Sequence, residues 1–418
     1  MDIEKVVLEI GQRASKASEE LGKAASTTKN QGLIEAANAI RSQSKQIVSA
    51  NHKDLENTSV KGLSKAMIDR LKLDDTGIEA MAVGLEEIAN LEDPVGNILD
   101  SWERPNGLAI SRITVPLGVI GVIYESRPNV TADAGGLCLK SGNAVILRGG
   151  SESYNSSTAI LNALRDGLRK VDLPLEAIQM VPTTDRSAVH QLLGLSKYID
   201  VIVPRGGKGL IEAVQTESKI PVFAHLEGIC HTYINEYSDP MMACDIVLNG
   251  KMRRTGICGA TETLFIDMKA SESHLPSILD ALIGAGCEIK GDKPTQAADK
   301  RVKNASELDW STEYLDSIIS IKQVTGVDDA IMHINRYGSE HTDAIVTNDE
   351  NIAEEFLSGV NSAIVLHNAS TQFADGGEFG MGAEIGIATG KLHARGPIGL
   401  EQLTTFKYVV RGNGQVRP

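Results

Sequence analysis

The sequence predicts an α/β protein with two α/β domains on parallel-type sheets and a small β element that stands apart from them. Its 418 residues suffice for two or three domains of roughly 150 residues each. Hydrophobic residues make up 42% and charged residues 23%, which is typical of a folded chain and not of a disordered one. Short apolar runs alternate with helical stretches twice along the chain, as parallel strands joined by helical crossovers do.

The N-terminal part, up to about residue 98, is rich in Ala, Glu and Lys and follows a helical period. Apolar residues three or four positions apart form one side of a helix. Two such faces are Val6, Ile10, Ala14, Ala17 and Leu21, and then Leu33, Ala37, Ile40 and Ile47. We expect helices that cover a sheet, and we assign no chemistry to them.

Two extended runs, Ile98–Pro105 and Leu108–Val115, follow these helices and are separated by Asn106-Gly107. That dipeptide suits a type I′ hairpin turn. The tail Thr404–Arg411 is also β-like, and its pairing with the hairpin is left open. A projecting hairpin often serves assembly, and an ordinary surface hairpin is the alternative.

The alternating pattern begins near residue 117. The first set of strand candidates is Leu117–Tyr124, Ala144–Leu147, Ile178–Val181 and Tyr198–Val203, with helices such as Tyr154–Arg169 and Arg186–Leu193. The second set is Thr232–Ile234, Thr263–Ile266, Ser317–Ile321, Asp343–Val346 and Ala363–Leu366, with helices near Pro240–Asn249, Glu272–Ile283 and Glu350–Phe356. Two α/β domains in succession predict a cleft between them, the usual place for a site that binds two substrates.

The charge balance is acidic, because 41 Lys and Arg stand against 55 Asp and Glu, a net charge of −14. This balance argues against nucleic acid as a partner, although a local basic pocket for one phosphate remains compatible with it. No apolar run reaches the roughly 18 residues of a membrane helix, and the start of the chain has no secretory pattern. We therefore expect a cytoplasmic protein that does not enter a membrane.

The five cysteines are widely spaced and form no C-x-x-C pair, so neither a disulfide framework nor a metal site is expected. Cys258 stands out because glycines flank it and Arg253 and Arg254 precede it. Positive charge lowers the pKa of a thiol, and the thiolate is the nucleophile. Cys258 is therefore a candidate nucleophile, with a buried structural cysteine as the alternative and Cys230 beside His231 as a weaker candidate. The remaining cysteines, which lack this setting, are Cys138, Cys244 and Cys287.

Two glycine-containing loops follow strand candidates. A glycine-rich turn at a helix N-terminus presents free N–H groups that suit a phosphate, although tight turns use glycine in any case. Neither loop matches the G-x-G-x-x-G or the G-x-x-x-x-G-K-[ST] pattern. Together they favour a dinucleotide site at the carboxyl ends of neighbouring strands. The candidate cofactor residues in these loops are Arg148, Gly149, Ser151, Gly206, Gly207 and Lys208.

A third segment, Glu125–Thr131, follows the first strand of this set. The Asn129 amide could donate a hydrogen bond to a developing oxyanion, and Arg127 could hold an anion. A simple Pro-Asn turn is the alternative interpretation.

These segments, in this order, resemble the aldehyde dehydrogenase superfamily and, within it, the gamma-glutamyl phosphate reductase family. The resemblance covers essentially the whole chain. Its most specific pieces are Glu125–Thr131, Arg254–Cys258, Val327–Thr347 and Phe373–Thr405. The last two lie outside what general aldehyde dehydrogenases share, so they favour the reductases.

The resemblance implies an aldehyde-dehydrogenase-like fold in three parts. Residues 1–104 and 117–228, with part of 368–390, would form a dinucleotide-binding domain, and residues 229–367 a catalytic domain. Residues 105–116 and 391–418 would form an oligomerisation hairpin and tail, for either a dimer or a tetramer.

The implied reaction is the NADPH-dependent reduction of L-glutamyl 5-phosphate to glutamate 5-semialdehyde, with release of phosphate, in proline biosynthesis. A glutamate 5-kinase would supply the labile acyl phosphate. The alternatives are a general NAD(P)-dependent aldehyde dehydrogenase and, from another class, a non-catalytic nucleotide-binding protein.

The resemblance also implies roles for particular residues. Cys258 falls on the family nucleophile, Asn129 on the oxyanion amide, and Glu313 on the glutamate that holds the nicotinamide ribose. Arg148 stands where the superfamily has a lysine at the adenosine ribose. Ser151 stands where NAD-preferring relatives often carry a glutamate, which favours NADP, while the strictness of that preference stays open.

The substrate is an anion, so a protein of charge −14 needs local positive groups to hold it. Arg127, Arg254 and His341 are the candidates, with internal salt bridges or helix caps as the alternative. Glu227 lies near the place of the hydrolytic base of aldehyde dehydrogenases, but it is off register, and we assign it no catalytic role.

Overall fold

The computed structural model describes residues 2–61, 63 and 65–417. The chain divides into two compact units, Met1–Ala224 with Gly380–Gly386 and Ile398–Pro418, and His225–Phe379 with Ile387–Pro397. The sequence predicts the boundary after residue 228, whereas the structure has it after Ala224. The Phe223 N–H still donates to the Ile202 carbonyl at 2.9 Å, so the chain leaves the first sheet only after that bond.

The first unit contains a four-stranded sheet in the order β5-β4-β3-β6, and all of its pairings are parallel. Its strands are β3 (Val119–Tyr124), β4 (Ala144–Gly149), β5 (Ile178–Met180) and β6 (Val201–Arg205). The four strands predicted from the apolar runs are confirmed. Every residue of β3 and β4 is buried, because helices cover both faces of the sheet.

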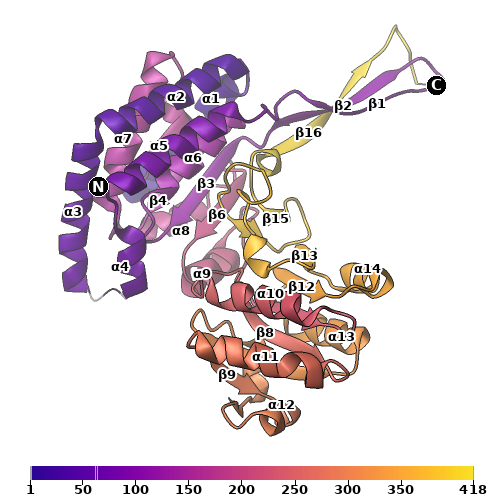
Figure 1. The fold of residues 1–418 in the computed structure, drawn as a ribbon. Coiled ribbons are helices and arrows are strands. Elements are labelled where there is room, and N and C mark those ends of the chain that lie inside the picture. The colour runs from indigo at the N-terminus through magenta and orange to yellow at the C-terminus, as the bar shows by residue number, and fades with distance from the viewer. Residues whose placement is uncertain (1, 62, 64, 418) are drawn as a thin grey trace. The chain divides into compact units, whose positions relative to one another are not determined.

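Nine helices belong to the described part of this unit (Figure 1). They are α1 (Ile3–Leu21), α2 (Ser26–Ser42), α3 (Ser44–Lys61), α4 (Lys65–Leu71), α5 (Asp75–Asn90), α6 (Val130–Lys140), α7 (Tyr154–Lys170), α8 (Ser187–Leu193) and α9 (Lys208–Glu217). The apolar face of α1 is buried as expected, and Ile10 and Ala14 pack in one cluster with Val119 and Ile146 of the sheet. Short 3₁₀ turns occur at Leu175–Ala177 and Glu401–Leu403.

A separate three-stranded antiparallel sheet belongs to the same unit. It has the order β1-β2-β16, from β1 (Ile98–Glu103), β2 (Ala109–Pro116) and β16 (Thr404–Arg411). The hairpin is therefore confirmed, and the tail pairs with it. The predicted type I′ turn is wrong: Gly107 has φ 82° but Asn106 does not have a positive φ. The N–H of Gly107 donates to the Arg104 carbonyl, which is typical of a type I turn followed by a glycine in a three-residue loop.

The second unit contains a seven-stranded parallel sheet in the order β10-β9-β11-β8-β7-β12-β13. Its strands are β7 (Cys230–Ile234), β8 (Thr261–Asp267), β9 (Glu288–Gly291), β10 (Lys303–Asn304), β11 (Ile318–Val324), β12 (Thr342–Val346) and β13 (Ile364–His367). Five of these match the second predicted set. The sequence pattern does not predict β9 and β10. β9 is short and has a single apolar residue between charged ones, and β10 has only two residues, both exposed.

The helices of the second unit are α10 (Pro240–Met252), α11 (Ser271–Gly284), α12 (Lys293–Ala298), α13 (Val327–Tyr337) and α14 (Glu350–Gly359). Two 3₁₀ turns (Glu307–Ser311 and Thr371–Phe373) and a small antiparallel pair of β14 (Ile387–Ala388) with β15 (Gly396–Pro397) complete it. Leu264 and Ile266 of β8, with Ile319 and Ile321 of β11, lie at the centre of a buried cluster that includes α10 and α11. This core fixes β8 and β11 against the helices α10 and α11.

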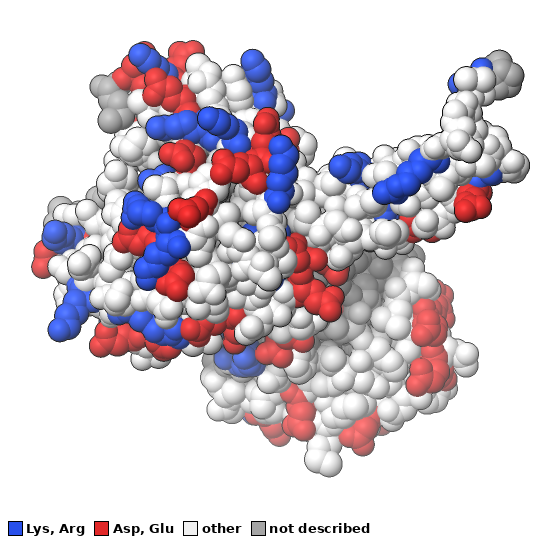
Figure 2. Space-filling model, turned by 90° about the horizontal axis from the view of Figure 1, so that it is seen from above, with Lys and Arg blue, Asp and Glu red and all other residues white. Residues whose placement is uncertain are grey.

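The surface carries both signs of charge. On the face seen in Figure 2, Lys and Arg side chains lie among Asp and Glu side chains and do not form one broad basic area. Among the described residues, the structure contains no helix with the length and apolar character needed to cross a bilayer.

Candidate active site

Cys258 lies in the loop between α10 and β8, close to the point where β8 begins. Gly228 backs this loop: a Cβ atom on Gly228 would lie 2.1 Å from the Cys258 carbonyl oxygen, so the approach requires glycine. The Cys230 thiol donates to the same carbonyl at 3.0 Å. The segment 228–230 therefore fixes the backbone that carries the candidate nucleophile.

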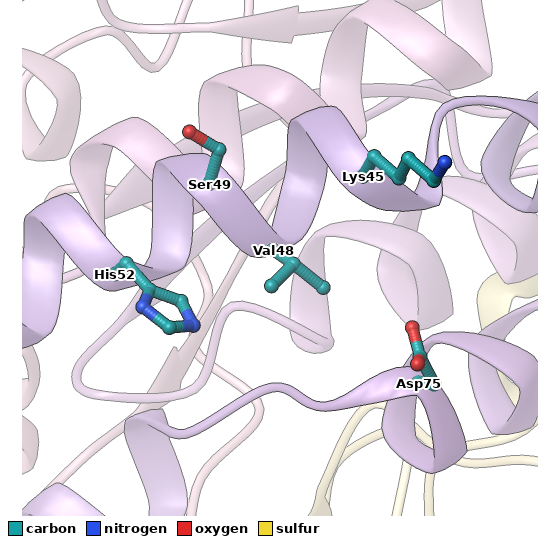
Figure 3. Close-up of a pocket in the computed structure, with 5 residues that line it drawn as sticks. All are labelled: Lys45, Val48, Ser49, His52 and Asp75. Atoms are coloured by element: carbon teal, nitrogen blue, oxygen red, sulfur yellow. The ribbon is translucent and has the colours of Figure 1, made fainter.

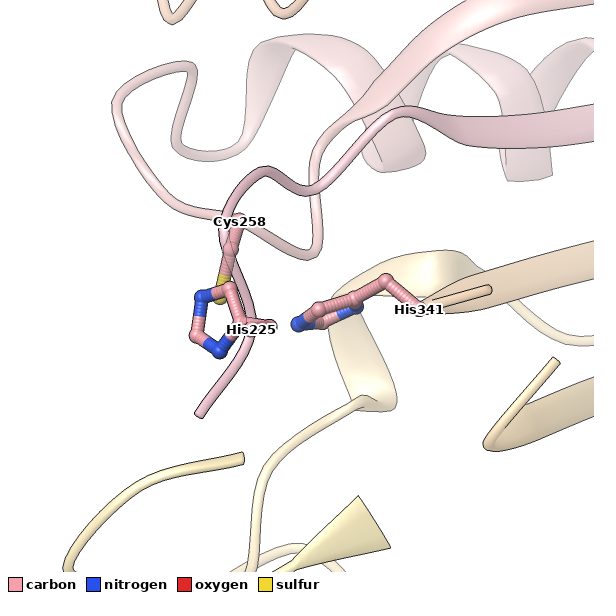
Figure 4. A group of neighbouring side chains, drawn as sticks. All are labelled: His225, Cys258 and His341. Carbon is pink, nitrogen blue, oxygen red and sulfur yellow. The ribbon is translucent and has the colours of Figure 1, made fainter. Parts of the chain in front are cut away.

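Two histidines surround the Cys258 thiol (Figure 4). The sulfur and one nitrogen each of His225 and His341 all lie within 4.8 Å of one another. His225 precedes β7, and His341 directly precedes β12, the parallel neighbour of β7. Since β8 is the neighbour on the other side of β7, the three side chains meet where three adjacent strands begin.

The two histidines have different surroundings. His225 is half-buried, and its Nδ1 lies 2.8 Å from the carbonyl oxygen of Ile387 in β14. His341 is completely buried, with Nδ1 2.8 Å from Thr342 Oγ1 and 3.8 Å from Cys230 Sγ. Its Nε2 is buried and has no hydrogen-bond partner in the described part of the chain.

The cluster controls the ionisation of the thiol. Burial raises the pKa of Cys258, but the charge of His341 and the hydrogen bond and charge of His225 outweigh burial and bring the pKa well below its usual value. Arg253 and Arg254, which the sequence suggests as the source of this effect, are both exposed, and the histidines take their place. The cluster thus favours the thiolate, the reactive form of cysteine.

The other four cysteines have raised pKa values. Burial, followed by the charge of Asp343, raises the pKa of Cys230 well above its usual value. Burial raises the pKa of Cys287 to about 11 and also raises the pKa values of Cys138 and Cys244. The pKa shifts therefore separate Cys258 from every other thiol, including the second candidate Cys230.

Glu313 belongs to the same unit and contacts the segment that packs against the Cys258 backbone. Its Oε1 accepts a hydrogen bond from the Gly228 N–H at 2.8 Å, and burial raises the pKa of this carboxyl group. Glu227 is half-buried and next to Gly228 in the chain. Glu313 is therefore tied to the segment that backs the nucleophile.

The predicted cofactor residues of the first unit lie at the carboxyl ends of β4 and β6. Arg148 is 7% exposed, and its guanidinium donates to the carbonyls of Gly149 at 2.8 Å and Thr184 at 2.9 Å. Its Nε is buried and has no partner in the described part of the chain, and the same holds for Arg205 Nε at the end of β6. Ser151 is exposed.

A carboxylate occupies the turn that the sequence suggests for a phosphate. Glu125, at the end of β3, accepts a hydrogen bond from the Gly207 N–H at 3.1 Å, one residue before α9 begins at Lys208. A Cβ atom on Gly206 would lie 2.5 Å from the same carboxylate. The helix N-terminus thus already holds an internal anion, which a phosphate would have to displace.

The remaining predicted residues lie on both units. In the first unit, Asn129 Nδ2 donates to Asp133 Oδ2 at 3.0 Å, and burial raises the pKa of Asp133 to about 6. Arg127, in the turn before α6, is half-buried. In the second unit, Arg254 is exposed near Cys258, while His341 lies against the thiol instead of facing solvent.

His225 is the site residue that the sequence reasoning misses. It stands only two positions before Glu227, but no local spacing connects it with Cys258 or His341. One thiol and two imidazoles are also donors of the kind found in zinc sites. A metal there would occupy the sulfur and compete with nucleophilic attack by it.

A cavity of about 460 Å³ lies elsewhere, in the first unit (Figure 3). Lys45, Val48, Ser49 and His52 of α3 line it together with Asp75 of α5. Lys45, Ser49, His52 and Asp75 are exposed, and we assign no chemistry to this cavity.

The chain matches the aldehyde dehydrogenase family model over residues 4–297, and it belongs to that family. Two parallel-sheet units in one chain, one of which carries a cysteine in a loop before a strand, fit this class of protein. Solved structures at 14–17% identity, such as an acetylating aldehyde dehydrogenase from Geobacillus thermoglucosidasius with a TM-score of 0.69, share the fold.

Within that family, the chain belongs to the gamma-glutamyl phosphate reductases. It is 64% identical over 417 residues to the gamma-glutamyl phosphate reductase of Paramagnetospirillum magneticum, covering 100% of this chain and 99% of that one. The protein of that name from Rhodospirillum rubrum is 58% identical over 417 residues, covering 100% of this chain and 98% of that one. The crystal structure of the Thermotoga maritima protein has a TM-score of 0.96 at 42% identity and covers 99% of this chain and 100% of that one.

Proposed function

We propose that this protein reduces L-glutamyl 5-phosphate to L-glutamate 5-semialdehyde with NADPH, releasing phosphate, as a step of proline biosynthesis in the cytoplasm. The observation that carries the proposal is the Cys258 thiol, whose sulfur lies within 4.8 Å of a nitrogen of both His225 and His341. A thiolate is a suitable nucleophile for an acyl phosphate. The 64% identity to a gamma-glutamyl phosphate reductase supports this substrate over other acyl compounds.

In the proposed mechanism, the Cys258 thiolate attacks the acyl carbon and phosphate leaves, so that a thioester forms. When bound, NADPH supplies the hydride that reduces this thioester. The tetrahedral adduct then collapses to the aldehyde and regenerates the thiolate. The Asn129 amide and the backbone N–H of Cys258 donate to the oxyanion in this proposal, where each donor contributes about 10²–10³ in rate. Asn129 would exchange its bond with Asp133 for the bond to substrate.

The cofactor proposal rests on the charges at the carboxyl ends of β4 and β6. Arg148 and Arg205 each carry a buried Nε without a partner among the described residues, and a phosphate oxygen would satisfy such donors. The carboxylates of Glu125 and Glu152 accept hydrogen bonds from the backbone N–H groups of Gly207 and Ser126, respectively. Their negative charges would repel a phosphate at those N–H groups.

We therefore propose that Arg148 and Arg205 hold the dinucleotide together with Gly149, Ser151, Gly206, Gly207 and Lys208, and that Glu313 holds the nicotinamide ribose. The preference for NADPH is tested by comparing kcat/KM for NADPH and NADH. The replacement Ser151→Glu should lower the value for NADPH and spare that for NADH, because a carboxylate repels a 2′-phosphate.

The proposed reaction is tested in reverse. Oxidation of glutamate 5-semialdehyde with NADP should require phosphate or arsenate, because only these can release the acyl group from Cys258. Cys258→Ala should abolish the reaction, and Cys244→Ala, a cysteine of α10 away from the cluster, should leave it intact. Turnover without phosphate would instead support a general aldehyde dehydrogenase.

We also propose that Arg127 and Arg254 hold the charged ends of the substrate.

We further propose that the chain forms a homo-oligomer through the β1-β2-β16 sheet. Large apolar side chains are exposed on this sheet, among them Leu99, Tyr408 and Val410. Such a patch is typical of an interface. Tyr408→Asp should reduce the mass measured by light scattering. A glutamate 5-kinase that delivers the labile substrate would be detected as a faster coupled rate than the free intermediate allows.

A further inference from the structure

We infer that His225 is the acid–base residue of the reaction: it takes the proton of the Cys258 thiol and returns it to the departing phosphate. This inference rests on the proposed function and adds a catalytic residue to it. It depends on the hydrogen bond between His225 and Ile387, on the arrangement around the sulfur, and on the proton balance of the reaction.

The hydrogen bond of His225 determines its tautomer. A backbone carbonyl oxygen can only accept, so the 2.8 Å contact with Ile387 requires that Nδ1 carries a hydrogen. In the neutral ring, Nε2 is then the unprotonated nitrogen, and it is the one on the side of the Cys258 sulfur (Figure 4). An imidazole in this tautomer is ready to accept the thiol proton.

The carbonyl that orients His225 is itself well held. Ile387 is 4% exposed and belongs to β14, which pairs with β15 through Ile387 and Pro397. In many enzymes a carboxylate orients the catalytic imidazole, and a fixed backbone carbonyl can fill that role. The Cys258 thiol, the His225 imidazole and the Ile387 carbonyl therefore follow one another in space, with the imidazole in the middle.

His341 is less suited to the same task. Its Nδ1 lies 2.8 Å from the Thr342 hydroxyl, which can either donate or accept, so this contact does not determine the tautomer. The ring is completely buried, and its centroid lies 4.8 Å from that of His225 in an edge-to-face contact. We assign His341 the stabilisation of the thiolate, because its charge lowers the pKa of Cys258 against the effect of burial.

The chemistry requires a proton at the leaving group. The phosphate group of the acyl phosphate carries two negative charges. When the carbon–sulfur bond forms and the bond between the acyl carbon and the phosphate oxygen breaks, the phosphate would leave as a trianion unless it gains a proton. The proton that His225 Nε2 took from the thiol balances this charge, and it leaves His225 neutral again. After hydride transfer, collapse of the adduct releases the thiolate, which recovers one proton from water through the same nitrogen.

Several other ionisable groups face this centre and belong in any pH analysis. They are Cys258 and Cys230 of the second unit, His341 before β12, and the carboxyl groups of Glu313 and Glu227. Glu313 interacts with His225 by charge.

The test is His225→Asn, in which the Asn amide can still donate to the Ile387 carbonyl while no nitrogen can accept the thiol proton. We expect a 10²–10⁴-fold loss in kcat, the usual contribution of a general acid–base residue. The reaction of Cys258 with iodoacetamide should shift to higher pH in the same variant. The exposed His190→Asn is the matched control and should change neither quantity.

The two readouts separate this inference from the proposed function. Iodoacetamide needs no substrate, so the alkylation profile tests His225 even if glutamate semialdehyde is not turned over. A wild-type kcat and alkylation profile in His225→Asn would overturn the inference. The alkylation profile of His341→Asn should also shift to higher pH, because the charge of His341 stabilises the thiolate. If His225→Asn does not fold, judged by thermal unfolding, His225→Gln is measured against the same two outcomes.

Discussion

Replacing Gly228 by Ala should disable Cys258 without touching any side chain of the cluster. A Cβ atom at Gly228 would lie 2.1 Å from the Cys258 carbonyl oxygen and 2.7 Å from its Cα, whereas real Cβ contacts essentially never fall below 3.0 Å. The two backbones must therefore move apart by at least 3.0 − 2.1 = 0.9 Å. Both neighbours are backbone, so no flexible side chain can absorb the shift.

The expected effect follows from this displacement. A misplacement of about 1 Å at a reacting group costs about 10²-fold in rate. We therefore expect kcat/KM for the phosphate-dependent oxidation of glutamate semialdehyde to fall by about 10²-fold. The Glu313 carboxylate, which accepts the Gly228 N–H, should move with the segment.

The matched control is Gly84→Ala in α5, where a Cβ atom would meet nothing within 4 Å. Alanine in a helix interior is about 0.5–1 kcal/mol more stable than glycine, so this variant should unfold at a slightly higher temperature with unchanged activity. A Gly228→Ala protein with kcat/KM within threefold of the wild type would refute the argument from backbone contact. A parallel thermal-unfolding measurement separates misplacement of Cys258 from loss of the fold.

Three further predictions concern other parts of the chain. Asn129→Ala should lower kcat by about 10²–10³-fold with a smaller change in KM, and an unchanged kcat would remove Asn129 from the oxyanion site. The rate of alkylation of Cys258 by iodoacetamide should rise with pH through a pKa well below 9 and then level off, because the fold favours its thiolate. Cys230, whose pKa is raised, should stay unmodified over the same pH range, and peptide mapping that finds Cys230 labelled first would contradict this order. Lys251 and Glu262 form a completely buried ion pair at 2.5 Å. Lys251→Met should lower the free energy of unfolding, measured in urea, by about 3–5 kcal/mol, because it leaves a buried carboxylate unpaired, and the double variant with Glu262→Leu should recover most of this loss. Equal stability of Lys251→Met and the wild type would show that the pair is not needed.

The hairpin shows how far local sequence can be taken. Two extended runs separated by the Asn106-Gly107 dipeptide predicted two paired strands, and β1 and β2 are those strands. The turn type depended on backbone angles that this dipeptide permits but does not impose, and only Gly107 has a positive φ. Likewise, the sequence could not decide whether β16 pairs with the hairpin, because that pairing joins segments from distant parts of the chain.

Cys258 and His225 mark the same limit at the site. Glycines and arginines adjacent in sequence drew attention to Cys258, since local composition is visible without the fold. The arginines nevertheless lie exposed, and the positive groups that lower its pKa are His341 and His225, from loops before β12 and β7. Their meeting depends on β12 and β8 flanking β7, an order that no local pattern reveals.

The sequence by itself predicted the α/β class, the buried parallel strands, the hairpin and Cys258 as a candidate nucleophile. Each of these predictions depends only on the periodicity of hydrophobic residues or on residues adjacent in the chain. The resemblance to the reductases added the reaction. Only the tertiary structure decided which strands lie side by side, that Gly228 presses against the Cys258 backbone, that Glu125 occupies the Gly207 turn, and that His225 is held by the Ile387 carbonyl. These contacts join residues far apart in the chain, and their energies depend on burial and distance, which exist only once the chain has folded.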